Sequence, residues 1–396
     1  MQISITPKKL SGSIEAVSSK SYAHRVLIAA ALADAPTDVH INVSSEDIEA
    51  TLRCIKALGA KTEKTENGFT VYPIDVPNEN AVLDCGESGS TARFMLAVCA
   101  ALCGKANLVG SGRLPERPMK ELAEALESGG ARCSGDFLPL TVCGRLHSGV
   151  YKLRGDISSQ FITGLMLALA MVEGESEIQL ITKTESAAYV DITVDVLKQF
   201  GIEVLKTNGG YKIFGGKYIS PKKIDVEGDW SNAAFWLAAS RMGGSISVSG
   251  LNPASRQGDK AFQSVIAENV IDASQIPDLV PIIAVYAASK KAVTEIVGAV
   301  RLRLKESDRI KTTVGLINSL GGKAEETDSG LVICGNGRLC GGVADGAGDH
   351  RIVMSAAIAA TICGREVVIN GAEAVKKSYP TFFEDYKKLG GEIHVL

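Results

Sequence analysis

Residues 160–172 read QFITGLMLALAMV, and residues 176–181, a few positions later, read SEIQLI. The first stretch places apolar side chains on nearly every side of a helix, which is typical of a helix enclosed by protein. The second alternates apolar and polar residues, which is typical of a strand with one face in water. The two stretches together predict a fold with helices inside and sheets outside.

This combination of an apolar helix and a short strand occurs six times along the chain. The helical runs are residues 22–33, 91–103, 160–172, 231–242, 279–288 and 350–363, and their starts are 69, 69, 71, 48 and 71 residues apart. Repetition at such a period indicates one supersecondary module per repeat, each burying its apolar face against its neighbours.

An amphipathic helix is expected after each strand. Five of these helices end on glycine, the usual residue beyond a helix C-terminus: Gly59, Gly129–Gly130, Gly201, Gly321–Gly322 and Gly390–Gly391. The repeat that begins at Ser231 lacks the usual hairpin, which explains the 48-residue step. The last repeat stops at EIHVL, one strand short, whereas the chain opens with an unattached strand, MQISITP. We therefore expect the two chain ends to pair.

These patterns predict an α/β fold, a two-domain inverse α/β barrel with three repeated units per domain. One domain is expected to comprise residues 14–224, and the other, discontinuous domain residues 1–13 and 225–396. An ordinary doubly wound sheet is the alternative, but there the strands rather than the helices read as continuous apolar runs. Two domains also suit a chain of 396 residues, which is longer than a single core usually supports.

The composition excludes several classes of protein. With 45% hydrophobic residues, 22% charged residues and a net charge of −3, the chain is neither disordered nor broadly nucleic-acid-binding. The nine cysteines form no C-x-x-C pair, so buried reduced thiols are expected rather than a metal site or a catalytic thiolate. The start, MQISITPKK, has no apolar signal segment, and no apolar stretch is long enough to span a membrane. We expect a cytoplasmic protein.

Basic side chains gather at the N-terminal ends of the apolar helices. Lys20, Arg25, Arg93 and Arg351 lie where unpaired N–H groups already carry partial positive charge. A cation is unfavourable there unless an anion lies nearby. The alternative is that the neighbouring serine and aspartate residues only cap the helices and that each arginine extends to solvent. Because the pattern recurs, it predicts a site for more than one anion.

Two further basic pairs lie outside this pattern. Arg113 and Arg117 flank a proline turn before a helix, and Lys305 and Arg309 are four residues apart in KESDR. At that spacing we expect Lys305 and Arg309 on one face of a helix.

Eight short motifs across essentially the whole chain resemble, in order, those of the 5-enolpyruvylshikimate-3-phosphate synthase family. Each motif alone is weak, but eight in order are specific. The motifs are Lys20-Ser21 with Arg25, GESGSTAR (86–93), LPERPM with Arg117, SSQF (158–161), IPD ending at Asp278, RLKESDR (303–309), DHR (349–351) and KKSYP (376–380).

The resemblance implies an enzyme of the shikimate pathway to aromatic amino acids, a 3-phosphoshikimate 1-carboxyvinyltransferase. Such an enzyme transfers the enolpyruvyl group of phosphoenolpyruvate to the 5-hydroxyl of shikimate 3-phosphate and releases phosphate. It uses neither a metal nor an organic cofactor. The expected partners are these two small substrates, with no nucleic acid or membrane, and the expected state is a monomer.

The resemblance also assigns residues. Those for shikimate 3-phosphate are Lys20, Ser21, Arg25, Ser158, Ser159, Gln160, Ser186, Asp278 and Lys305. Those for phosphoenolpyruvate are Lys20, Gly89, Arg117, Gln160, Arg309, Arg351 and Lys377. The catalytic candidates are Asp278 as the base toward the hydroxyl, Glu306 as acid and then base at the methylene carbon, and Lys20. Arginine clamps and helix N-termini suit two substrates that repel each other.

Two other functions stay open at this point. UDP-N-acetylglucosamine enolpyruvyl transferase shares the fold, but it normally uses a loop cysteine and lacks SSQF. A non-catalytic scaffold for phosphorylated ligands would not need Asp278 and Glu306 near the basic groups. Glu87, Phe94 and Arg301 depart from residues frequent in the family, which leaves the response to phosphoenolpyruvate-mimicking inhibitors open.

Overall fold

A buried helix forms the centre of each repeat. In the computed structural model, which describes residues 1–396, these helices are α1 (Lys20–Ala31), α3 (Gly89–Leu102), α5 (Ser159–Leu169), α7 (Trp230–Arg241), α9 (Val280–Ala288) and α11 (His350–Ala359). Every residue of α5 except Gln160 is buried, as expected for a helix that is apolar on all sides. The six predicted central helices are confirmed.

A second helix follows in each repeat. These helices are α2 (Glu46–Ala57), α4 (Lys120–Ser128), α6 (Ala187–Gln199), α8 (Phe262–Val265), α10 (Arg309–Ser319) and α12 (Phe382–Lys388). All except the short α8 are followed by a glycine with φ between 79° and 116°, namely Gly59, Gly130, Gly201, Gly321 and Gly390. Only glycine adopts this conformation readily, so the predicted C-terminal signals are confirmed.

The chain divides into two units by its internal contacts. Unit 1 comprises Met1–Val17 and Glu227–Leu396, and unit 2 comprises Ser18–Val226. The chain therefore leaves unit 1 between residues 17 and 18 and returns between 226 and 227. The sequence predicts these crossings at 13/14 and 224/225.

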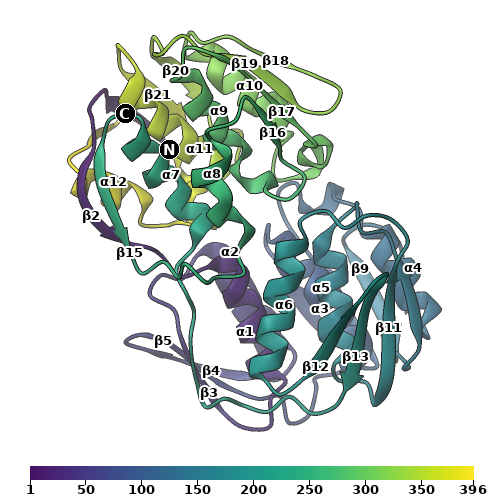
Figure 1. Ribbon diagram of the computed structural model, residues 1–396. Coiled ribbons are helices and arrows are strands. Elements are labelled where there is room, and N and C mark those ends of the chain that lie inside the picture. Colours follow the sequence, from purple (N-terminus) through teal and green to yellow (C-terminus); the bar gives the residue numbers. More distant parts are fainter. The chain divides into compact units, whose positions relative to one another are not determined.

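Unit 2 has three four-stranded sheets, with strand orders β14-β3-β5-β4, β6-β7-β9-β8 and β10-β11-β13-β12. The sheets lie outside the central helices (Figure 1). Burial alternates along their strands, for example along β3, so one face of each sheet packs on the helices. The strands are β3 (Thr37–His40), β4 (Lys61–Thr65), β5 (Gly68–Tyr72), β6 (Ala81–Asp84), β7 (Lys105–Val109), β8 (Ala131–Cys133), β9 (Leu140–Gly144), β10 (Val150–Leu153), β11 (Gly174–Leu180), β12 (Glu203–Thr207), β13 (Gly210–Gly215) and β14 (Lys223–Asp225).

Unit 1 has two four-stranded sheets, β16-β17-β19-β18 and β20-β21-β1-β22, and a two-stranded sheet, β15-β2. The two-stranded sheet belongs to the repeat that lacks a hairpin. The strands are β1 (Gln2–Thr6), β2 (Ser11–Glu15), β15 (Ser245–Ser249), β16 (Val270–Asp272), β17 (Val293–Val297), β18 (Ala324–Glu326), β19 (Leu331–Cys334), β20 (Gly342–Asp345), β21 (Val367–Asn370) and β22 (Glu392–Val395). With helices inside and sheets outside in both units, the predicted inverse α/β barrel is confirmed.

The two ends of the chain pair, as expected. Strand β1 lies between β21 and β22 and is antiparallel to both, with Ile5 opposite Val367 on one side and Ile393 on the other. Ile3 and Ile5 are buried. Strand β1 is thus the third strand of its sheet. In the corresponding sheets of unit 2 the third strand is β9 or β13, each of which comes from the same repeat as its neighbours.

The strands that precede α1 and α7 are exchanged. In four repeats the strand before the central helix pairs in parallel with the strand after it, as in β6 with β7. Strand β2 precedes α1, but it pairs with β15, which follows α7. Strand β14 precedes α7, but it pairs with β3, which follows α1. This exchange, which the repeat pattern does not predict, places β2 in unit 1 and β14 in unit 2.

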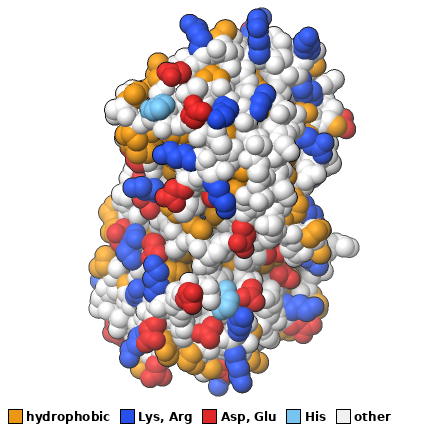
Figure 2. Space-filling model, turned by 90° about the vertical axis from the view of Figure 1, so that its left-hand side faces the viewer, with side chains coloured by type: hydrophobic (Ala, Val, Ile, Leu, Met, Phe, Trp, Pro, Cys, Tyr) orange, Lys and Arg blue, Asp and Glu red, His pale blue; other side chains and the backbone are white.

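Several further expectations concern the surface and the thiols. No helix is both long and apolar enough to cross a membrane. On the face shown in Figure 2, acidic and basic side chains are interspersed. No disulfide joins the nine cysteines, and Cys54, Cys85, Cys99 and Cys103 are buried. The expectation of burial is wrong for Cys340, which is exposed.

We predict that Ile5→Ala lowers the free energy of unfolding of unit 1 by about 2–5 kcal/mol, because it removes a fully buried side chain from a strand that is paired on both sides. Chemical denaturation measures this change. The control is Gln2→Ala in the same strand, where the exposed side chain should change stability by no more than about 0.5 kcal/mol. Equal effects of the two substitutions would contradict a central role for β1.

Candidate active site

A close contact between α3 and α5 brings two of the predicted motifs together in unit 2. A Cβ atom at Gly164 would lie 2.5 Å from the Arg93 carbonyl oxygen, so glycine is required for this approach. At the N-terminal ends of the two helices, Gln160 Nε2 donates to Ser90 Oγ over 2.8 Å, and Arg93 Nη1 donates to Gln160 Oε1 over 2.5 Å. The contact therefore joins SSQF to GESGSTAR.

Arg25 is buried among neutral groups. It is 2% exposed, and its guanidinium donates to Thr193 Oγ1 (2.8 Å), the Ser21 carbonyl (2.6 Å) and the Tyr189 carbonyl (2.9 Å). The Phe94 ring lies beneath it, 4.9 Å from ring centroid to Cζ. No carboxylate pairs with Arg25, and burial lowers its pKa to about 9. Its charge is thus fixed in place by polar contacts but not neutralised, which suits an anionic ligand.

Arg117 lies against the start of α3. A Cβ atom at Gly89 would lie 2.7 Å from Arg117 Nη1, so glycine leaves the room that the guanidinium occupies. Arg117 directly follows the 3-10 turn η1 (Leu114–Glu116), which contains Pro115. Arg117 is 6% exposed. A guanidinium and a helix N-terminus together form a site that favours an anion.

The other predicted residues of unit 2 lie at helix starts. Lys20 Nζ pairs with Asp47 Oδ2 over 2.7 Å. Ser158 is the N-cap of α5, and its Oγ accepts from the Gln160 N–H over 3.2 Å. Ser159 is buried beside it, and Ser186 is the N-cap residue of α6, with φ 54°. Sequence reasoning missed Asp47, because an aspartate in a first helical turn is ordinary.

Arg309 is the centre of a network in unit 1. The network contains four other predicted residues: Asp278, Lys305, Glu306 and Arg351. Arg309 is 1% exposed and donates to Asp349 Oδ2 (2.7 Å), Asp278 Oδ1 (2.8 Å) and Glu306 Oε2 (2.7 Å). Burial disfavours the charge of Arg309, but the three carboxylates outweigh burial and raise its pKa above the usual range. Asp349 belongs to the DHR motif, but the sequence assigns it no role. The structure shows that its carboxylate is part of the network through Arg309.

Asp278 is the shared partner of three cations. Its Oδ1 lies 2.8 Å from Arg309 Nη1 and 3.5 Å from Lys305 Nζ, and its Oδ2 accepts from Arg351 Nη2 over 3.1 Å. These contacts favour the ionised carboxylate. Asp278 lies in the 3-10 turn η3 (Pro277–Leu279), and Leu279 is the N-cap residue of α9. Asp278 therefore does not occupy the capping position of α9.

The expectation that Lys305 and Arg309 share a helix face is wrong. Helix α10 begins at Arg309, and Lys305 follows the 3-10 turn η4 (Val300–Leu304) in an extended conformation. Asp308 caps α10 and ends the intervening turn. The two cations still meet, because both contact Asp278.

The alternative that each arginine extends to solvent is also wrong. Arg25, Arg93 and Arg351 are 2%, 5% and 4% exposed. Lys377, in the 3-10 segment η6 (Ala372–Lys377), donates to the Gly348 carbonyl over 2.7 Å, just before the start of α11. The predicted residues of unit 1 thus gather near the starts of α9, α10 and α11.

The three departures from the family pattern have separate positions. Phe94 is fully buried beneath Arg25 and contacts the edge of His24. Arg301 Nη2 donates to the Ser274 carbonyl over 3.0 Å. The Glu87 carboxylate packs against Gly112, on the side where a Cβ atom would be in any other residue.

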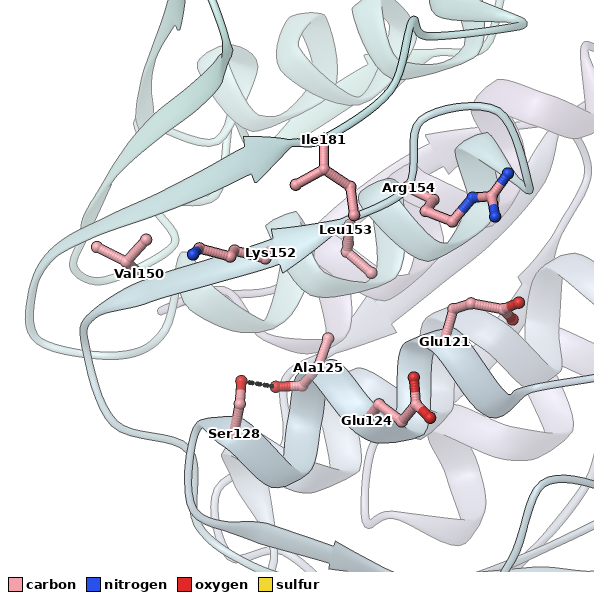
Figure 3. Close-up of a pocket in the computed structure, with 9 residues that line it drawn as sticks. All are labelled: Glu121, Glu124, Ala125, Ser128, Val150, Lys152, Leu153, Arg154 and Ile181. Carbon is pink, nitrogen blue, oxygen red and sulfur yellow. Dashed lines mark hydrogen bonds between the residues drawn. The ribbon is translucent and has the colours of Figure 1, made fainter.

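A separate pocket of about 410 Å³ lies between α4 and β10 (Figure 3). No predicted site residue lines it. Its charged side chains are separated by sign, since the acidic Glu121 and Glu124 come from the helix and the basic Lys152 and Arg154 from the strand and the residue after it. The other lining residues are Ala125, Ser128, Val150, Leu153 and Ile181.

A family model described as EPSP synthase (3-phosphoshikimate 1-carboxyvinyltransferase) matches residues 5–270 and 263–386. The chain belongs to the EPSP synthase family. It is similar to the 3-phosphoshikimate 1-carboxyvinyltransferases of Clostridium acetobutylicum (41% identity) and Clostridium kluyveri (39%), covering 99% of this chain and 98% of each relative. The solved EPSP synthase of Acinetobacter baumannii superposes with a TM-score of 0.82 at 25% identity, over the whole of both chains. EPSP synthase family membership thus extends over both units.

We predict that Asp349→Ala lowers the free energy of unfolding by about 3–5 kcal/mol, because it leaves the buried Arg309 guanidinium undercompensated and removes the cap of α11. Thermal or chemical denaturation measures the loss. The control is Glu326→Ala, which breaks an ion pair with Arg303 of the same 2.7 Å length but with both side chains more than one-third exposed. That change should cost about 1 kcal/mol or less.

Proposed function

We propose that the chain is a 3-phosphoshikimate 1-carboxyvinyltransferase. It transfers the enolpyruvyl group of phosphoenolpyruvate to the 5-hydroxyl of shikimate 3-phosphate and releases phosphate, a step of the shikimate pathway to aromatic amino acids. Membership of the EPSP synthase family over the whole chain supports this reaction. The observation that carries it is the placement of Asp278 and Glu306 on one guanidinium, that of Arg309. A scaffold that only bound phosphorylated ligands would not need these carboxylates beside its cations.

The substrate assignments extend this proposal. Shikimate 3-phosphate is bound by Lys20, Ser21, Arg25, Ser158, Ser159, Gln160, Ser186, Asp278 and Lys305, and phosphoenolpyruvate by Lys20, Gly89, Arg117, Gln160, Arg309, Arg351 and Lys377. Two features support the assignments. Arg25 keeps a charge that no carboxylate offsets, and Arg117 lies against the N-terminus of α3. Both features attract phosphate or carboxylate groups.

The acid and base roles follow from the network of unit 1. Asp278 removes the proton from the 5-hydroxyl as the oxygen attacks carbon 2 of phosphoenolpyruvate, and Glu306, after taking up a proton from solvent, gives that proton to the methylene carbon. In the resulting tetrahedral intermediate, Glu306 takes a proton back from the new methyl group as phosphate leaves. Arg309 supports both carboxylates, through Nη1 and Nη2 respectively. Lys20, held by Asp47, is the remaining candidate for proton transfer.

The scheme includes no metal or organic cofactor, since each step is a proton transfer, an addition to the double bond or an elimination of phosphate. The proposal includes a monomeric enzyme in the cytoplasm whose partners are its two small substrates.

A phosphate-release assay tests the function. Phosphate should appear only when phosphoenolpyruvate and shikimate 3-phosphate are both present, and omission of either should abolish it. UDP-N-acetylglucosamine in place of shikimate 3-phosphate should give none. Release with the UDP sugar alone as acceptor would identify the sister transferase instead.

We predict that Asp278→Asn lowers kcat by roughly 100-fold or more, because asparagine keeps one of the two oxygens that accept from Arg309 and Arg351 but cannot take the proton. Shikimate 3-phosphate should still bind, as measured by calorimetry. The control is Asp308→Asn, since asparagine caps α10 nearly as well as aspartate and kcat should stay near that of the wild type. A folded Asp278→Asn enzyme with undiminished turnover would move the base elsewhere.

A further inference from the structure

A chain of buried hydrogen bonds links three helices of unit 2. His24 Nδ1 of α1 lies 2.7 Å from Thr51 Oγ1 of α2, and Thr51 Oγ1 lies 2.7 Å from Thr91 Oγ1 of α3. Thr91 Oγ1 in turn donates to Ser88 Oγ over 2.8 Å. All four residues are at most 1% exposed. The chain ends at the N-cap of α3, one residue before Gly89.

The proton positions in this chain have a single consistent order. Since Thr91 gives its hydroxyl proton to Ser88, it must accept from Thr51. Since Thr51 gives its own proton to Thr91, it must accept from His24, whose Nδ1 is therefore the protonated nitrogen. Ser88 Oγ receives two hydrogen bonds, from the hydroxyl and from the backbone N–H of Thr91. The hydroxyl proton of Ser88 is then the only one in this series of hydrogen bonds that has no assigned acceptor.

The surroundings of His24 agree with a neutral ring. The ring lies edge-on against Phe94, with centroids 6.4 Å apart, and its Nε2 is buried without a hydrogen-bond partner. Burial, followed by the charges of Lys20 and Arg25, lowers the pKa of His24 well below its usual value. A charged ring would need an acceptor at Nε2, whereas the Nδ1–H tautomer places only a lone pair there.

We infer that His24, Thr51 and Thr91 are positioning residues that hold the Ser88 hydroxyl as a hydrogen-bond donor to the anionic group of phosphoenolpyruvate at the start of α3. The inference rests on the proposed function for the identity of the anion. The location follows from Ser88 preceding Gly89, against which the Arg117 guanidinium packs. One directed hydroxyl, one helix N-terminus and one guanidinium then converge on the same anion.

Nitrogen NMR tests the order of the protons without any reference to activity. The chain has five histidines, so ¹⁵N-histidine labelling gives few signals, and the His24 signal is the one lost in His24→Asn. We expect a neutral Nδ1–H tautomer for His24 in the wild type. A neutral Nε2–H tautomer, or a charged ring at pH 7, would overturn the inference even if the enzyme is active.

Steady-state kinetics test the effect on the substrate. Ser88→Ala should raise the KM for phosphoenolpyruvate about tenfold or more and leave that for shikimate 3-phosphate nearly unchanged, as for loss of one hydrogen bond to a charged group. Thr51→Val should raise the same KM about threefold in the wild type but not in Ser88→Ala, because its effect passes through Ser88. Thr51→Ser keeps the hydroxyl, so its KM for phosphoenolpyruvate should be close to that of the wild type. An equal effect of Thr51→Val in both backgrounds, or an unchanged KM in Ser88→Ala, would refute the role.

Two controls separate this role from a structural one. Ser45→Ala removes an N-cap of the same kind, from α2, and should lower the melting temperature without raising the KM. Thr294→Val replaces a buried hydroxyl of unit 1 that has no hydrogen-bond partner, and it should leave the kinetics unchanged. If the wild type releases no phosphate from the two substrates, the proposed function fails, and the NMR result still decides the proton order.

Discussion

A helix that is apolar on all sides can meet water only at its ends. Helices α1, α3, α5 and α11 obey that constraint, since α5, for example, buries every residue except Gln160 near its start. Polar side chains therefore have to gather at helix ends, and the N-terminal ends are those that attract anions. Close packing then brings neighbouring ends together, as Gly164 does for α3 and α5. The position of the candidate site residues is therefore a consequence of how the core is filled.

The two units use their cations differently. In unit 2, Arg25 is held by hydroxyls and carbonyls, so its charge is positioned without being neutralised. In unit 1, Lys305, Arg309 and Arg351 share a network with Asp278, Glu306 and Asp349, and the formal charges of these six groups cancel. The first arrangement favours binding of an anion, whereas the second stabilises the ionised form of its carboxylates. In both arrangements fixed polar partners hold the charged groups in place.

The sequence predicts the layers, the six repeats and the pairing of the chain ends, because each depends on a periodic pattern or on a missing strand. It does not predict the exchange of β2 and β14, since a strand with the same alternation can pair with either of two equivalent neighbours. It also misplaces Lys305, because the cap at Asp308 starts α10 later than charge spacing suggests. Asp47 and the His24–Thr51 contact carry no local signal, because partners from separate helices meet only in the folded chain.

The placement of β1 and β2 also sets an order for folding during synthesis. All strands of unit 2 have been made once the ribosome has passed residue 225, so its three sheets can close while the rest of the chain is still being translated. Unit 1 cannot close then, because β1 needs β21 and β22, which come from the last 30 residues. Strand β1 is thus made long before its partners, and until they are made it is an unpaired strand that the nascent chain must keep from associating elsewhere.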